Sequence, residues 1–71
     1  MTKFIIKFVS KVVPSNEGYF FRMRKVGFSS VLQRSRARKF TTIENAFDMR
    51  DKLEAAEGEW YTFTIEEFEV V

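Results

Sequence analysis

The sequence predicts an α+β fold: a three-stranded antiparallel meander with one helix packed on one face, completed by a fourth, C-terminal strand, in the order β-β-β-α-β. Three observations support this prediction. Apolar residues recur at every second position in the first half of the chain and again near its end, which is typical of strands. Residues 43–53 carry apolar residues at helical spacing instead. The chain has 71 residues, so we expect a single domain over residues 1–71.

The first two predicted strands form a hairpin. Phe4, Ile6 and Phe8 alternate with polar or smaller residues, which predicts a strand over residues 3–12 with an apolar face toward the core. Residues 14–18, Pro-Ser-Asn-Glu-Gly, are typical of a turn. A second strand follows over residues 19–26. Strict alternation places Tyr19, Phe21 and Met23 on the helix side of the sheet and Phe20, Arg22 and Arg24 on the open face.

The third predicted strand carries a row of arginines. Residues 27–30, Gly-Phe-Ser-Ser, are expected to form the turn that precedes it. The strand itself is expected over residues 31–39. Arg34, Arg36 and Arg38 recur at every second position, so in a strand all three guanidinium groups project from one face.

The helix and the last strand complete the expected fold. Thr41 or Thr42 caps the helix, and Thr41 with Glu44 fits a capping box. The apolar stripe consists of Ile43, Ala46, Met49 and Leu53, and Gly58 ends the helix. A fourth strand is expected over residues 59–70, with Tyr61, Phe63 and Ile65 inward and a bulge or frayed end at residues 66–67. We expect this strand to lie beside the first strand and parallel to it, after a right-handed crossover.

The composition excludes the common kinds of active site. The chain has no cysteine and no histidine, so it lacks disulfides, cysteine-based metal sites and the commonest general base. It contains no Ser-His-Asp set, no Cys-His pair and no glycine-rich phosphate loop. We therefore expect no enzyme, no catalytic residue, no metal and no cofactor. Its apolar runs are too short for a membrane helix, so no membrane partner is expected. The expected location is cytoplasmic, in the host cytoplasm if the protein is phage-encoded.

Charge is divided sharply along the chain. Residues 1–41 hold ten basic residues and one acidic residue, whereas residues 42–71 hold two basic and nine acidic ones. The two parts carry net charges of +9 and −7, which add to the overall +2. One explanation is internal, with the acidic helix and last strand neutralising the basic sheet. The other is a binding surface for an external polyanion.

The second explanation leads to a specific site. Cations and aromatic side chains on one open sheet face suit nucleic acid, because Arg and Lys neutralise phosphates and aromatic rings stack on bases. Charged side chains on an edge strand also prevent aggregation, which is the alternative explanation for the arginine row. The residues expected to bind DNA or RNA are Lys7, Phe20, Arg22, Arg24, Arg34, Arg36, Arg38 and Lys39.

Residues 18–53 resemble the AP2-type and phage-integrase arm-binding domains. The resemblance is carried by Gly-Tyr-Phe-Phe-Arg-Met-Arg at residues 18–24, Lys-Phe at 39–40 and Thr-Ile-Glu-Asn-Ala at 42–46. It implies a three-stranded sheet backed by one helix, with the sheet docked in the major groove of DNA. The DNA-facing positions that it implies are Arg22, Arg24, Arg34 and Arg36, and Ala46 is the implied close contact between helix and sheet.

Two other functions stay open at this point. The chain resembles, as a class, small phage-type inhibitor or anti-defence proteins that dock a host protein, including a nucleic-acid-handling protein. Its acidic helix and C-terminal strand would then mimic nucleic acid through Glu54, Glu57, Glu59, Glu66, Glu67 and Glu69. The third possibility is a homodimer formed by pairing of edge strands.

Overall fold

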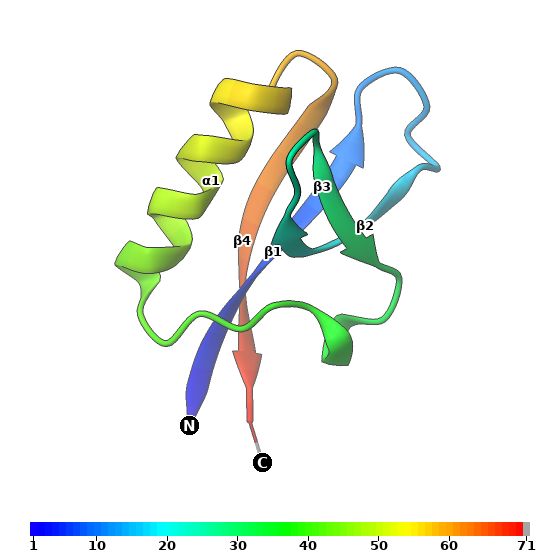
Figure 1. Ribbon diagram of the computed structural model, residues 1–71. Coiled ribbons are helices and arrows are strands. Elements are labelled where there is room, and N and C mark those ends of the chain that lie inside the picture. Colours follow the sequence, from blue (N-terminus) through cyan, green and yellow to red (C-terminus); the bar gives the residue numbers. More distant parts are fainter. Residues whose placement is uncertain (71) are drawn as a thin grey trace.

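The computed structural model describes residues 1–70 and confirms the predicted α+β class and element order (Figure 1). The elements are β1 (Thr2–Ser10), β2 (Glu17–Met23), β3 (Phe28–Val31), the 3₁₀ helix η1 (Arg34–Arg36), α1 (Ile43–Glu57) and β4 (Tyr61–Glu69). They form one four-stranded sheet with the strand order β3-β2-β1-β4 and with α1 packed against it. Within residues 1–70, no helix has the length and apolar character needed to cross a membrane.

β4 pairs with β1 in antiparallel orientation, so the predicted parallel pairing is wrong. The cause is the direction of α1. Just before α1, Phe40 bridges to Phe4 near the start of β1, and just after α1 the carbonyl of Gly58 accepts a hydrogen bond from Lys11 beyond the end of β1. α1 therefore runs along β1, and the chain returns antiparallel to it. The pairing continues from Ser10↔Tyr61 to Thr2↔Glu69 without a shift, so the bulge expected at residues 66–67 is also absent.

The third strand is shorter and lies earlier than predicted. β3 covers Phe28–Val31, most of which was expected to be a turn, and the segment expected to carry the arginine row contains η1 instead. The turn is compact because Gly27 adopts a φ of 76°, a left-handed conformation that glycine adopts without strain. Phe28 then packs in the core, with its ring centroid 5.2 Å from that of Phe8. Because Phe28 packs against the core, β3 begins at residue 28, three residues before the predicted start at residue 31.

β2 contains a β-bulge, and the faces predicted for Tyr19, Phe20 and Phe21 are wrong. Phe20 pairs with Ser30 and Arg22 pairs with Ser29, so Phe21 is an extra residue on β2. Phe20 is fully buried and belongs to the core. Its position on the open face, as strict alternation predicted, is therefore wrong. Because Ser29 and Ser30 point to opposite faces of β3, the pairing puts Arg22 on the face opposite Phe20.

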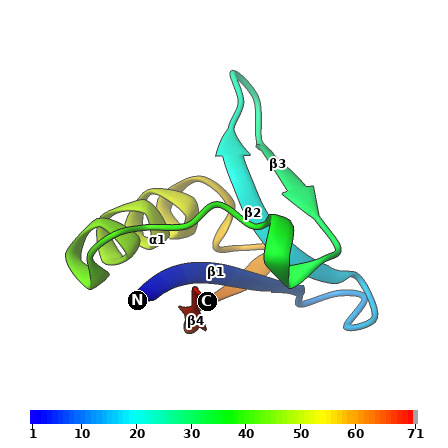
Figure 2. The same cartoon turned by 90° about the horizontal axis from the view of Figure 1, so that it is seen from below.

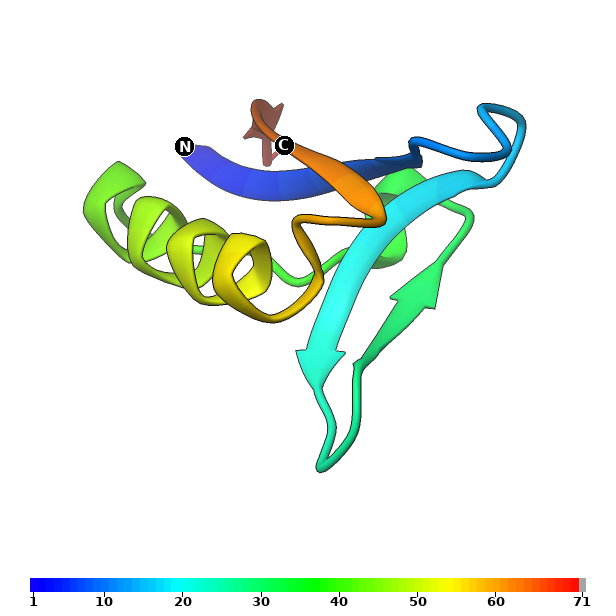
Figure 3. The same ribbon diagram turned by 90° about the horizontal axis from the view of Figure 1, so that it is seen from above.

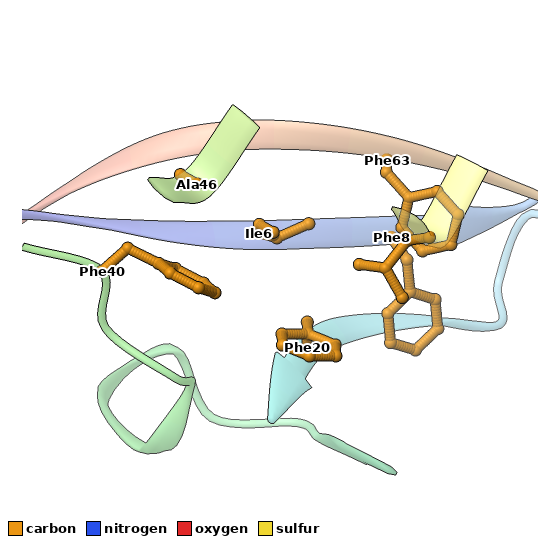
Figure 4. Close-up of a cluster of buried hydrophobic side chains, with 7 residues drawn as sticks. Ile6, Phe8, Phe20, Phe40, Ala46 and Phe63 are labelled. Atoms are coloured by element: carbon orange, nitrogen blue, oxygen red, sulfur yellow. The ribbon is translucent and has the colours of Figure 1, made fainter. Parts of the chain in front are cut away.

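The core fills the space between the sheet and α1. Its buried side chains are Ile6, Phe8, Phe20, Phe40, Ala46, Leu53 and Phe63 (Figure 4). The predicted inward residues of β4 are confirmed, with Tyr61 and Ile65 packed against this cluster. Gly18 is part of this packing, since a Cβ there would lie 3.0 Å from the Val31 carbonyl oxygen and 3.1 Å from the Phe8 ring.

The helix is aligned and capped much as predicted. Ala46 and Leu53 are buried and Met49 packs beside them, whereas Ile43 lies at the exposed margin of the stripe. Thr42 is the N-cap, and its Oγ1 accepts a hydrogen bond from the Asn45 backbone N–H over 3.3 Å. The third helical residue is thus Asn45 and not Glu44, so the proposed capping box does not form.

The β2–β3 hairpin projects from the body of the molecule. In Figures 2 and 3 it leaves the β1–β4 pair and projects on the same side of that pair as α1, with the turn at residues 24–27 at its tip. β2 pairs with β1 only through Glu17, Gly18 and Tyr19, which leaves the rest of β2 free to diverge. The chain at residues 38–40 lies between β1 and β2, where the Arg38 N–H donates to the Phe20 carbonyl and the Phe40 N–H donates to the Phe4 carbonyl.

Candidate nucleic-acid interface

The sheet has an inner face, which packs on α1, and an outer face, which has no α-helix against it. Ile6 and Phe8 belong to the core, so they define the inner face of β1. Strand alternation places Lys3, Ile5, Lys7 and Val9 on the outer face. The predicted binding surface corresponds to this outer face, and the structure divides it into two parts.

One part of the outer face is closed by the segment after β3. Arg34 Nε lies 3.1 Å from Glu66 Oε1, and Arg34 Nη2 donates to the Glu67 carbonyl over 2.7 Å. The Arg34 guanidinium and the Lys39 ammonium lie 5.6 Å and 4.8 Å from the centre of the Phe68 ring. Glu66 pairs across the strands with Ile5, which is fully buried. This end of the face is therefore occupied by the chain's own side chains.

The other part of the outer face is open and surrounds β2. Tyr19 pairs with Lys7, so both share the outer face. Alternation from the buried Phe20 places Phe21 there, and the bulge places Arg22 there as well. Arg24 and Lys25 follow in the exposed hairpin turn. We call this group the outer patch; it consists of Lys7, Tyr19, Phe21, Arg22, Arg24 and Lys25.

The charges of this region are not compensated within the described structure. Residues 18–43, which include most of β2, β3 and η1, hold seven basic residues and no acidic one. Across residues 1–70, Arg34 and Arg50 are the only Lys or Arg residues with a carboxylate oxygen within 4.0 Å. Within residues 1–70, ion pairs between the basic and the acidic half are limited to Arg34 with Glu66 and the Met1 ammonium with Glu69. Glu17, at the start of β2, is an exposed carboxylate beside the outer patch.

The structure brings together only part of the predicted site. Lys7, Arg22 and Arg24 lie in or next to the open part of the outer face. Phe20 is fully buried, so its ring is not available to a base. Arg34 is held by Glu66, and Lys39 donates to the carbonyls of Ser35 and Ala37.

Arg36 and Arg38, the two other arginines of the predicted row, do not line up with Arg34. Arg36 is exposed on η1, and the Arg38 guanidinium lies 5.5 Å from the centre of the Phe40 ring. A 3₁₀ helix has three residues per turn, so it does not align side chains that are two residues apart. The continuous row of three guanidinium groups predicted for residues 34–38 is therefore absent.

Sequence reasoning left three members of the outer patch out of the site. Phe21 was placed on the core side, although the residue is 43% exposed in the structure. Tyr19 was placed on the core side with it, and Lys25 was not assigned a role. The run Phe-Arg-Met-Arg-Lys at residues 21–25 held a signal, because it combines one aromatic and three basic residues without an acid. The position of the bulge was needed to interpret it.

A second charged surface lies on α1. Glu44, Asp48 and Asp51 are spaced by four and three residues, so they share the helix face that points away from the core. All three are exposed, and none lies within 4.0 Å of a cation in residues 1–70. This row is an acidic surface on the exposed side of α1.

The structure offers little that resembles a catalytic cleft. Two shallow hollows of about 380 and 210 Å³ lie near the end of α1, and Glu54 lines the first while Glu57 lines the second. The two carboxylates therefore do not converge on one cleft. Residues 1–70 contain no group of three or more acidic side chains placed to hold a metal ion. Comparison with family models, with curated proteins and with solved structures found no match to this chain.

Proposed function

We propose that this protein binds nucleic acid through the outer patch. The observation that supports the proposal is the set of four cations, Lys7, Arg22, Arg24 and Lys25, on or beside one open region of the sheet, none with a carboxylate within 4.0 Å in residues 1–70. Cations at such a surface bind phosphates and release the counterions condensed on the polyanion, which favours association.

Salt dependence tests this proposal. Fluorescence anisotropy with labelled DNA and RNA, measured over a range of salt concentrations, gives the slope of log affinity against log salt. We call the triple variant Arg22→Gln/Arg24→Gln/Lys25→Gln the hairpin variant. In it we expect the slope magnitude to fall by about 2 to 3, since each lost phosphate contact contributes roughly 0.7 to 0.9.

The matched control removes the same charge elsewhere. Arg36→Gln/Arg38→Gln/Lys52→Gln changes three exposed cations outside the outer patch. We expect its slope to stay within about one unit of the original protein's slope. If the protein binds neither DNA nor RNA at low salt, or if the control lowers the slope as much as the hairpin variant, the proposal is wrong.

The acidic row of α1 supports a second candidate function, docking of a basic groove on a nucleic-acid-handling protein. Its basis is that Glu44, Asp48 and Asp51 are exposed, aligned and unpaired with cations in residues 1–70. Replacing the three by Gln, Asn and Asn discriminates between the two functions. If this variant no longer docks to the partner protein while the hairpin variant still does, the acidic-mimic function is favoured.

A further inference from the structure

We propose that the ligand of the outer patch is single-stranded nucleic acid and that Phe21 stacks on one of its bases. This inference rests on the proposed function and specifies the ligand. It begins with the cost of exposing Phe21. A phenylalanine residue that is 43% exposed on a projecting hairpin leaves apolar surface in water. Seven aromatic ring pairs form within residues 1–70, and Phe21 takes part in none of them.

The bulge gives this exposure a structural origin. Without the extra residue, regular alternation that buries Phe20 would leave Phe21 and Arg22 on opposite faces. The observed pairing puts both on the outer face, side by side in the sequence. A bulge thus allows Phe20 to complete the core while the next two residues present a ring and a guanidinium group to the same ligand.

The outer patch combines aromatic rings with neighbouring cations. Tyr19 has Lys7 as its cross-strand neighbour, and Phe21 has Arg22 beside it. Each ring therefore has a cation next to it, as each base of a nucleic-acid strand has a phosphate next to it. Tyr19 is half-buried, so Phe21 offers the more accessible ring.

The choice of a single strand follows from the accessibility of the base faces. In a duplex the faces of the bases are stacked on one another, and proteins reach mainly base edges and the backbone. In a single strand the faces are available, and stacking on an aromatic side chain tolerates any base. An exposed aromatic ring among cations gains contact with a single strand that it does not gain with an intact duplex.

An abasic oligonucleotide isolates the stacking contribution. It keeps the phosphates of the corresponding oligo(dT) strand but has no bases. We expect the original protein to bind oligo(dT) about 5- to 160-fold more tightly than the abasic strand, the equivalent of ~1–3 kcal/mol for one stacked base. In Phe21→Ala this ratio should fall to about one, while the salt slope stays unchanged. Oligo(U) and a DNA duplex of the same length distinguish RNA from DNA and single strands from duplex.

A second variant tests stacking directly. Trp60 is the only tryptophan, so Trp60→Phe/Phe21→Trp carries a single indole at position 21. Its fluorescence should be quenched by oligo(dT) and unchanged by the abasic strand. Circular dichroism of both variants confirms that they are folded.

The outcomes separate this inference from the function on which it rests. Equal affinity for oligo(dT) and the abasic strand, or tighter binding of the duplex, would overturn the single-strand assignment. If the hairpin variant still lowers the salt slope in that case, the protein binds nucleic acid through phosphates alone. If the hairpin variant leaves the slope unchanged, the proposed function itself fails.

Discussion

Phe20 and Phe21 are adjacent residues of the same type, and the structure gives them opposite roles. Phe20 is fully buried and its ring stacks near that of Phe40, with centroids 6.3 Å apart, whereas Phe21 is 43% exposed. Replacing a buried phenylalanine by alanine typically costs about 3–5 kcal/mol, because transfer free energy is lost and a cavity remains. Phe21→Ala leaves no enclosed cavity, so it should cost only the transfer free energy of its covered part, about 1–1.5 kcal/mol.

Urea unfolding followed by far-ultraviolet circular dichroism measures both variants. A domain of this length has a free energy of unfolding of roughly 4–11 kcal/mol, so Phe20→Ala should lose much of it, with a large drop in midpoint. Phe21→Ala should unfold cooperatively close to the original protein. If Phe21→Ala were the more destabilised variant, Phe21 would be the core residue, and the bulge that defines the outer patch would not exist.

Three further changes test other parts of the structure. Thr42→Ala removes the N-cap hydrogen bond to the Asn45 N–H and should cost about 1 kcal/mol in the same urea assay, and an unchanged midpoint would show that the cap contributes nothing. Gly27→Ala places a Cβ at a φ of 76° and should destabilise by about 1–2 kcal/mol, unless the turn changes its conformation at no cost. Glu17→Gln removes the carboxylate beside the outer patch and should tighten nucleic-acid binding about two- to five-fold at low salt, with the effect disappearing at high salt. Weaker binding by this variant would contradict the location of the site.

The elements that the sequence predicted well are those with one apolar face to bury. Phe4, Ile6 and Phe8 on β1 and Phe63 on β4 share the face that packs against the core, and a shift of one residue would turn all of them to the other face. The stripe of Ala46, Met49 and Leu53 defines the face of α1 in the same way. The fold class followed from these patterns, because each requires a partner surface.

The row of arginines had no such constraint. Residues 33–39 contain one apolar residue, Ala37, so a strand there would have had no face to bury. Alternation of charge alone does not stabilise a strand, since like charges on one face repel each other. The chain instead turns through η1, and Arg34 pairs with Glu66. This contact depends on the antiparallel placement of β4, which local patterns do not reveal.

The bulge in β2 escaped prediction for a related reason. Residues 19–23 read Tyr-Phe-Phe-Arg-Met, so apolar residues are available for either face. The packing of Phe20 against Phe40 and of Phe28 against Phe8 decides between the two registers. Phe28 and Phe40 lie 8 and 20 residues beyond Phe20, and their positions are set by the tertiary fold.

The most direct test of the outer patch is a map of backbone amide chemical shifts during titration with oligo(dT). The proposed site predicts the largest changes at Lys7, Tyr19 and residues 21–25, with residues 43–57 of α1 unaffected. Changes concentrated on α1, or around the closed region of Arg34 and Glu66, would contradict the assignment of the binding surface.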